Sequence, residues 1–220
     1  MYNFILLASL LFSPLFALEI RETPIEFGET RNELTKKYIK EHYGLDVNDI
    51  KIVPKMVVVH HTAIDDFGGS LSCFASQTIS SNRPDINNGG AVNVSAHFLV
   101  ARDGTVHQLM PLDTMARHVI GLNYNSIGIE NVGGQGGVDN LTKEQLEANI
   151  ALISELQKRF PTIEYLIGHY EYKCFDGHEL WLERDKGYRT HKDDPSQRFM
   201  DELRANVSGF KSAPCGQGQR

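Results

Sequence analysis

Apolar and polar positions along the chain change period several times, which predicts strands and helices mixed along the sequence. The segment "KMVVVHH", residues 55–61, is continuously apolar up to two histidines and directly follows Pro54. Such a run is typical of a central strand covered on both faces. The segment "IEYLIGH", residues 163–169, predicts a second short buried strand that also ends in histidine.

Three segments have helical spacing. Residues 29–44 predict a lead-in helix that ends at Gly44, and residues 194–207 predict a final helix that begins near Pro195. The segment "LTKEQLEANIALISELQKRFP", residues 141–161, predicts the longest helix. Thr142 and Gln145 have the spacing of a capping box, and Pro161 lies past the end of the helix. The apolar face consists of Leu146, Ile150, Ile153 and Leu156.

The pattern in the middle of the chain predicts strands and turns. Residues 94–111 predict a hairpin that turns at Asp103 and Gly104, and "NSIGIENVGG", residues 125–134, predicts a strand that enters a glycine-rich loop. A short helix is expected within 68–81, and residues 82–90 have turn chemistry throughout. The whole is typical of an α/β protein without internal repeats.

The first residues predict export. The uncharged apolar run from Phe4 to Ala17 has the length of a signal-peptide core, so we expect a signal peptide over residues 1–17 and a periplasmic or secreted protein. A retained anchor or a buried helix is the alternative. No later stretch is apolar enough to span a membrane. A net charge of -6 without a basic cluster argues against nucleic acid as a partner.

Histidines and carboxylates follow the strand ends. His60 and His61 end one strand, His169 ends another, and "HKDDP" lies further on. Catalytic zinc sites use three such ligands and leave a fourth position open, although each histidine alone could equally belong to the core or the surface. Neighbours on a strand point to opposite faces, so His60 and His61 cannot easily hold the same metal.

Five motifs together resemble a known family. "VVVHHTA", "SAHFLVARDGTV", "NSIGIENVGG", "LIGHYEY" and "KDDP" occur in the order found in the type 2 N-acetylmuramoyl-L-alanine amidases, which are zinc hydrolases related to the peptidoglycan recognition proteins. The resemblance implies a mixed central β-sheet flanked by helices on both faces. The amidase resemblance covers residues 55–207. With the elements expected from the residue pattern, the domain organisation is 1–17 signal peptide, 18–54 lead-in with helix, 55–207 zinc amidase domain, and 208–220 flexible tail.

The resemblance implies roles for particular residues. His60, His169 and Asp194 match the zinc ligands. Glu130 matches the acidic residue that acts on the attacking water, and Lys192 matches the basic residue that faces the scissile carbonyl. Strand alternation agrees, because it puts Glu130 on the same face as two small residues, Ser126 and Gly128.

The third ligand has rivals. The gap of 25 residues from His169 to Asp194 contains Cys174, Asp176 and His178, and in other branches of the family this ligand is a cysteine. Cys174 is therefore the main rival to Asp194. The chain has three cysteines, which allow at most one internal disulfide. A bond between Cys73 and Cys174 would remove the rival.

Other histidines are candidates for weaker roles. Ala96 stands where some relatives have a catalytic tyrosine, which makes the neighbouring His97 a candidate for the substrate cleft, with pairing inside the hairpin as the alternative. His118 is a candidate for substrate contact, and His61 for the cleft wall, for support of the site or for core packing. Surface or unexplained roles are left for His42, His107, His178 and His191.

The expected activity is zinc-dependent hydrolysis of the amide between N-acetylmuramic acid and L-alanine of peptidoglycan. Intact wall and soluble muropeptides are both possible substrates, in remodelling, recycling or attack. The alternative is a peptidoglycan-binding module of the same fold that does not catalyse, and a deacetylase is a further competitor. The sequence leaves the oligomeric state open.

Overall fold

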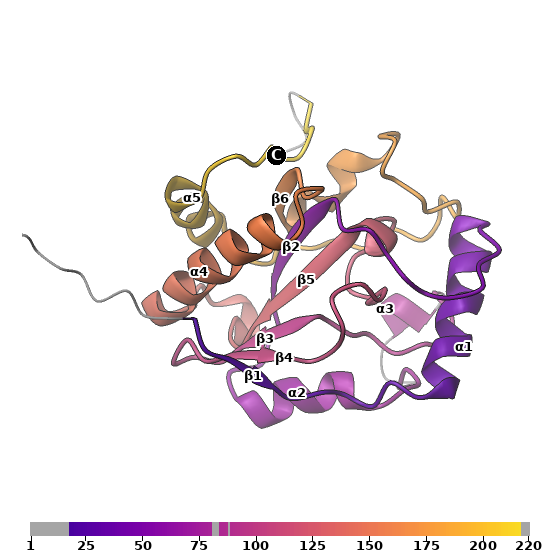
Figure 1. The fold of residues 1–220 in the computed structure, drawn as a ribbon, viewed down its shortest axis with the longest axis horizontal. Coiled ribbons are helices and arrows are strands. Elements are labelled where there is room, and N and C mark those ends of the chain that lie inside the picture. Colours follow the sequence, from indigo (N-terminus) through magenta and orange to yellow (C-terminus); the bar gives the residue numbers. More distant parts are fainter. Residues whose placement is uncertain (1–17, 81–83, 88, 217–220) are drawn as a thin grey trace, which may run out of the picture.

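The computed structural model describes residues 18–80, 84–87 and 89–216, which form one mixed β-sheet with helices around it (Figure 1). The predicted signal peptide, residues 1–17, lies outside the described residues. Within the described ranges, no helix has both the length and the apolar character needed to cross a membrane.

The sheet has six strands in the order β1-β4-β3-β5-β2-β6. Among the six strands of the described residues, β3 and β4 are the antiparallel pair, joined by the predicted hairpin, where Gly104 has a positive φ of 84°. The other neighbours pair parallel, so the sheet is mixed, as predicted. The strands are β1 (Ile20–Glu22), β2 (Met56–His61), β3 (Phe98–Val100), β4 (Val106–Gln108), β5 (Ser126–Asn131) and β6 (Tyr165–Gly168).

Helices cover both faces of this sheet (Figure 1). On one face, α4 (Lys143–Arg159) and α5 (Gln197–Asn206) pack on Val57, Val59 and their neighbours. On the other, α1 (Glu29–Tyr38) and its π-helical continuation η1 (Ile39–Tyr43) enclose Met56 and Val58. The remaining helices are α2 (Phe67–Ala75), α3 (Pro84–Asn87), η2 (Asn123–Asn125), η3 (Gln135–Gly137) and η4 (His169–Phe175).

Helix α4 has the predicted capping box, but its buried face also contains polar residues. The Nε2 of Gln145 donates to the carbonyls of Val100 and Val132, and the Nδ2 of Asn149 donates to the Oδ1 of Asn131. These bonds compensate for the loss of water around the amides. Leu152, Ile153 and Leu156 are fully covered, whereas Leu146 and Ile150 of the predicted face are half-buried.

The C-terminal segment supplies the disulfide partner of Cys174, a pairing that the sequence left open, and differs from the expected flexible tail. Cys174 forms a disulfide with Cys215, not with Cys73, which is exposed on α2. Lys211 extends the sheet by pairing with its edge: its N–H donates to the Glu164 carbonyl, and its carbonyl accepts from the Leu166 N–H. The expected flexible tail is therefore tied down at both points within residues 208–216.

Candidate active site

At the end of strand β2, the side chains of the adjacent residues His60 and His61 lie on opposite faces of the sheet. His60 follows Met56 and Val58 onto the face that α1 covers, and its side chain is buried. His61 is half-buried and packs over Gly134, where a Cβ atom would lie 2.5 Å from the ring. Gly134 also has a positive φ of 78°, so the predicted glycine-rich loop needs glycine here to pass beneath His61.

His60, His169 and Asp194 meet at the carboxyl end of β2. Each offers one ligand atom within 4.8 Å of the others, and all three residues are buried. The Nδ1 of His169 lies 3.1 Å from the Asp194 carboxylate, and the Nδ1 of His60 lies 3.4 Å from it. Two imidazoles and one carboxylate form a donor set that zinc accepts in hydrolases, with one position left open.

The electrostatics of the cluster favour the metal-binding forms of His60 and Asp194. Burial lowers the pKa of His60 from its usual 6.5 to about 4, and the neighbouring His169 acts in the same direction. Burial alone would raise the pKa of Asp194, but the two histidines outweigh it and hold that pKa well below its usual range. A neutral imidazole and an ionised carboxylate are the forms that bind metal.

The rivals for the third ligand position lie elsewhere. The sulfur of Cys174 is bonded to Cys215. Asp176 pairs with Arg189 at 3.1 Å, and the ring of His178 packs against Tyr165 and Phe175. Among the described residues, Asp194 is therefore the residue that joins the two histidines.

Glu130 and Lys192 face the same cavity as the cluster. Glu130 is the register partner of His60 in the parallel pair of β5 and β2, so both side chains lie on one face of the sheet. The cavity has a volume of about 290 Å³, and its wall includes His60, His169, Asp194, Glu130, Lys192, His61 and His118. All but one of the predicted site residues thus surround one space.

His97 is the exception. Its ring is fully buried and absent from the cavity wall. Its Nε2 donates to the Thr114 carbonyl at 2.9 Å, while its Nδ1 accepts from the Gly128 N–H at 3.0 Å. The expected place in the cleft is therefore wrong, because His97 is a core histidine with both nitrogens occupied.

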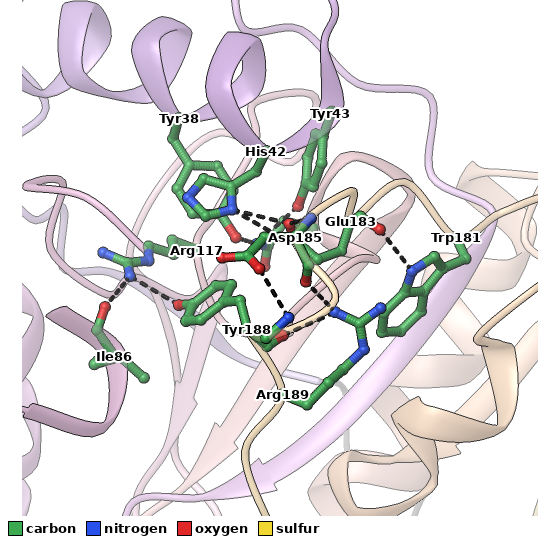
Figure 2. Close-up of polar contacts among 12 residues, drawn as sticks. Tyr38, His42, Tyr43, Ile86, Arg117, Trp181, Glu183, Asp185, Tyr188 and Arg189 are labelled. Carbon is green, nitrogen blue, oxygen red and sulfur yellow. Dashed lines mark hydrogen bonds and ion pairs between the residues drawn. The ribbon is translucent and has the colours of Figure 1, made fainter. Parts of the chain in front are cut away.

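A buried polar cluster anchors the segment that leads to Lys192 and Asp194 (Figure 2). His42 of η1 bonds Glu183 at 2.9 Å, and neither side chain is exposed to an appreciable extent. Arg117 donates to the Tyr188 hydroxyl at 2.9 Å and to the Ile86 carbonyl at 2.6 Å. These bonds fix Glu183 against η1 and Tyr188 against Arg117, which is part of the cavity wall.

Sequence reasoning missed this cluster. His42 was expected at the surface or without a role, yet it is buried and paired with a residue 141 positions away. The local pattern gave no signal for the pair. Arg117 offered one, since it is a lone charge beside the apolar run that follows His118.

The fold and the site define an α/β protein with a candidate metal centre at the carboxyl ends of parallel strands. Residues 50–197 match the family model described as N-acetylmuramoyl-L-alanine amidase, and the chain belongs to this family. The family resemblance predicted from the sequence is thereby confirmed, as is the mixed α/β fold.

Individual relatives agree with this assignment. The chain is 33% identical over 143 residues to the 1,6-anhydro-N-acetylmuramyl-L-alanine amidase AmpD of Citrobacter freundii, covering 58% of this chain and 73% of that protein. It is 33% identical over 84 residues to an endolysin of Enterobacteria phage K11, covering 36% of this chain. The match spans only about half, 56%, of the endolysin. A crystal structure of selenomethionine AmpD superposes with a TM-score of 0.52 at 25% identity, covering 88% of this chain and 97% of that one.

Proposed function

We propose that the protein is a zinc-dependent amidase that hydrolyses the bond between N-acetylmuramic acid and L-alanine of the peptidoglycan stem peptide. The observation that carries the proposal is the arrangement of His60, His169 and Asp194 in one cavity with Glu130 and Lys192. The similarity to the 1,6-anhydro-N-acetylmuramyl-L-alanine amidase AmpD supports this class of substrate.

The residues present fit zinc. The cluster is compact and buried, and its carboxylate balances part of a divalent charge. Two histidines and one aspartate would hold the ion. When bound, zinc supplies Lewis acidity, which makes a water molecule more nucleophilic and polarises the substrate carbonyl.

Glu130 moves the proton in the proposed reaction. Its carboxylate accepts a proton from the attacking water as the new C–O bond forms, and then delivers that proton to the amide nitrogen as the C–N bond breaks. The products are a lactyl carboxylate and a peptide with a free L-alanine amino group. The register pairing of Glu130 with His60 supports this role, because both side chains lie on one face of the sheet.

Lys192 stabilises charge on the substrate. The carbonyl oxygen becomes negative when water adds to the carbon, and an ammonium group nearby lowers the energy of that state. Lys192 lies two residues before Asp194, so the segment that supplies the carboxylate ligand also brings the cation to the cavity wall.

We place this activity in the periplasm or outside the cell. The Cys174–Cys215 disulfide supports the proposal, because structural disulfides persist in oxidising compartments. Peptidoglycan occupies the same compartment. Protein isolated from its host is titrated with a reducing agent, and the mass of the protein shows whether the disulfide formed in the cell. A reduced Cys174 in the isolated protein would contradict a periplasmic or extracellular location.

Digestion of peptidoglycan tests the proposed function. Protein stripped with a chelator and then reconstituted with zinc is incubated with purified sacculi and with soluble muropeptides, and the products are identified by mass spectrometry. An amidase releases stem peptides with a free L-alanine amino group, and only after zinc is restored. Binding without release supports the non-catalytic module, and release of acetate supports a deacetylase.

A further inference from the structure

We propose that His118 is a positioning residue for His60. It accepts a hydrogen bond from the Nε2 of His60 and so leaves the Nδ1 of that ring free to bind a metal. The inference rests on the proposed function, because it concerns the metal centre. It assigns His118 a role different from the substrate contact predicted from the sequence.

The contacts form a chain that starts at the metal cluster. The Nδ1 of His60 faces Asp194, while its Nε2 lies 2.9 Å from the Nδ1 of His118. The Nε2 of His118 lies 3.1 Å from the hydroxyl of Ser126, and that hydroxyl donates to the Leu122 carbonyl at 2.9 Å. We call this chain the imidazole relay.

The end of the relay sets its direction. A carbonyl can only accept a hydrogen bond, so the Ser126 hydroxyl donates its one proton to the Leu122 carbonyl. The same hydroxyl can therefore only accept a hydrogen bond from His118. The neutral ring of His118 then has its proton on Nε2, and its Nδ1 must accept from His60. The neutral ring of His60 therefore has its proton on Nε2. Its Nδ1 is unprotonated, and the lone pair of that atom points toward Asp194.

Asp194 competes with the relay when no metal is bound. His60 has one proton for two acceptors, the carboxylate at its Nδ1 and His118 at its Nε2. A proton on Nδ1 would block that atom as a ligand. The relay offsets this competition, as partners of metal-binding histidines commonly do by fixing the tautomer and the ring orientation.

Strand β5 is shaped to hold His118. A Cβ atom at Gly128 would lie 2.8 Å from the His118 ring, so the absence of a side chain lets the ring rest on the strand. The Oδ1 of Asn123 accepts from the backbone N–H groups of His118 and Val119, at 2.8 and 2.7 Å. The ring and the backbone of His118 are thus both fixed, and neither ring nitrogen is left over for substrate.

A matched pair of variants tests the relay. Leucine and asparagine have similar size, but only His118→Asn offers an acceptor near the position of the Nδ1. We expect His118→Leu to bind zinc about 10–100-fold more weakly than wild type, and His118→Asn to recover most of that loss. Zinc affinity is measured by competition with a chromophoric chelator. Equal affinity of wild type and a folded His118→Leu protein would overturn the relay.

Nitrogen NMR of the wild-type rings tests the relay without any substitution. In the zinc-loaded protein we expect the His118 proton on Nε2 and the His60 proton on Nε2. A His118 proton on Nδ1 would overturn the relay even if both variants fail to fold. Failure of the wild-type protein to bind zinc would instead contradict the metal centre, and the relay with it, so the two failures are distinguishable.

Discussion

The Nδ1 of His169 lies 3.1 Å from the carboxylate of Asp194, although 25 residues separate them in the sequence. The intervening chain returns to the sheet because several bonds hold it, including one from the Tyr172 hydroxyl to the Thr190 carbonyl at 2.5 Å. The disulfide from Cys174 ties its first part to the C-terminal segment. The segment between the two residues therefore completes the site by bringing Asp194 to His169.

Replacing Glu130 with glutamine should abolish proton transfer and leave the metal centre intact. Glutamine has the size of glutamate but cannot act as a base near neutral pH. We expect kcat to fall about 10²–10⁴-fold in Glu130→Gln, with unchanged zinc content. Steady-state hydrolysis of a muropeptide, together with metal analysis, checks this. Activity near the wild-type level would exclude Glu130 as the base.

Replacing Lys192 with methionine should weaken the transition state more than substrate binding. The aliphatic length is kept while the charge is lost. We expect Lys192→Met to lower kcat about 10²–10³-fold with little change in KM. The kinetics of wild type and variant, measured at the same zinc loading, decide the question. A rise in KM at constant kcat would assign Lys192 to substrate binding instead.

His97 should make the metal-free protein sensitive to mild acid. Burial lowers the pKa of His97 from 6.5 to about 4, so between these values the unfolded chain binds a proton that the folded chain does not. Stability therefore falls as pH drops through this window, by about 2 kcal/mol from this residue between pH 7.5 and pH 5. Urea unfolding at both pH values measures the change.

The variant His97→Gln serves as the control for this effect. Its amide can still donate to the Thr114 carbonyl, but it does not titrate. The variant should be less stable than wild type at pH 7.5 and should show a smaller loss on acidification. An identical pH dependence in both proteins would mean that His97 is not the responsible group.

The Cys174–Cys215 bond should stabilise the fold by about 2–4 kcal/mol, because it closes a loop of 41 residues in the unfolded chain. The free energy of unfolding of Cys215→Ser, compared with wild type, measures this contribution. Cys73→Ser is the matched control, since that thiol is exposed and outside the disulfide, and it should cost less than about 0.5 kcal/mol. Equal losses in the two variants would refute the role of the bond.

Local patterns predicted most of the fold. Continuous apolar runs marked β2 and β6, and the Thr142–Gln145 spacing marked the start of α4. Strand alternation also separated His60 from His61, because the rule is local. The convergence of His60, His169 and Asp194 came instead from the family resemblance, since no short-range pattern joins ligands on distant elements.

The remaining features depend on pairs that only the folded chain defines. Asn149 can lie on the core face of helix α4 because Asn131, on strand β5, accepts its hydrogen bond. The choice of Cys215 as the partner of Cys174 depends on where the C-terminal segment runs. His97 and His118 look alike in the sequence, and only their partners distinguish a core histidine from one that supports His60.

The central claim is that His60, and not His61, holds the metal. Zinc content per chain, measured by elemental analysis after dialysis, tests it most directly on His60→Ala and His61→Ala. The structure predicts stoichiometric zinc in wild type and in His61→Ala, and none in a folded His60→Ala protein. Zinc retained by His60→Ala, or lost from His61→Ala alone, would contradict the account.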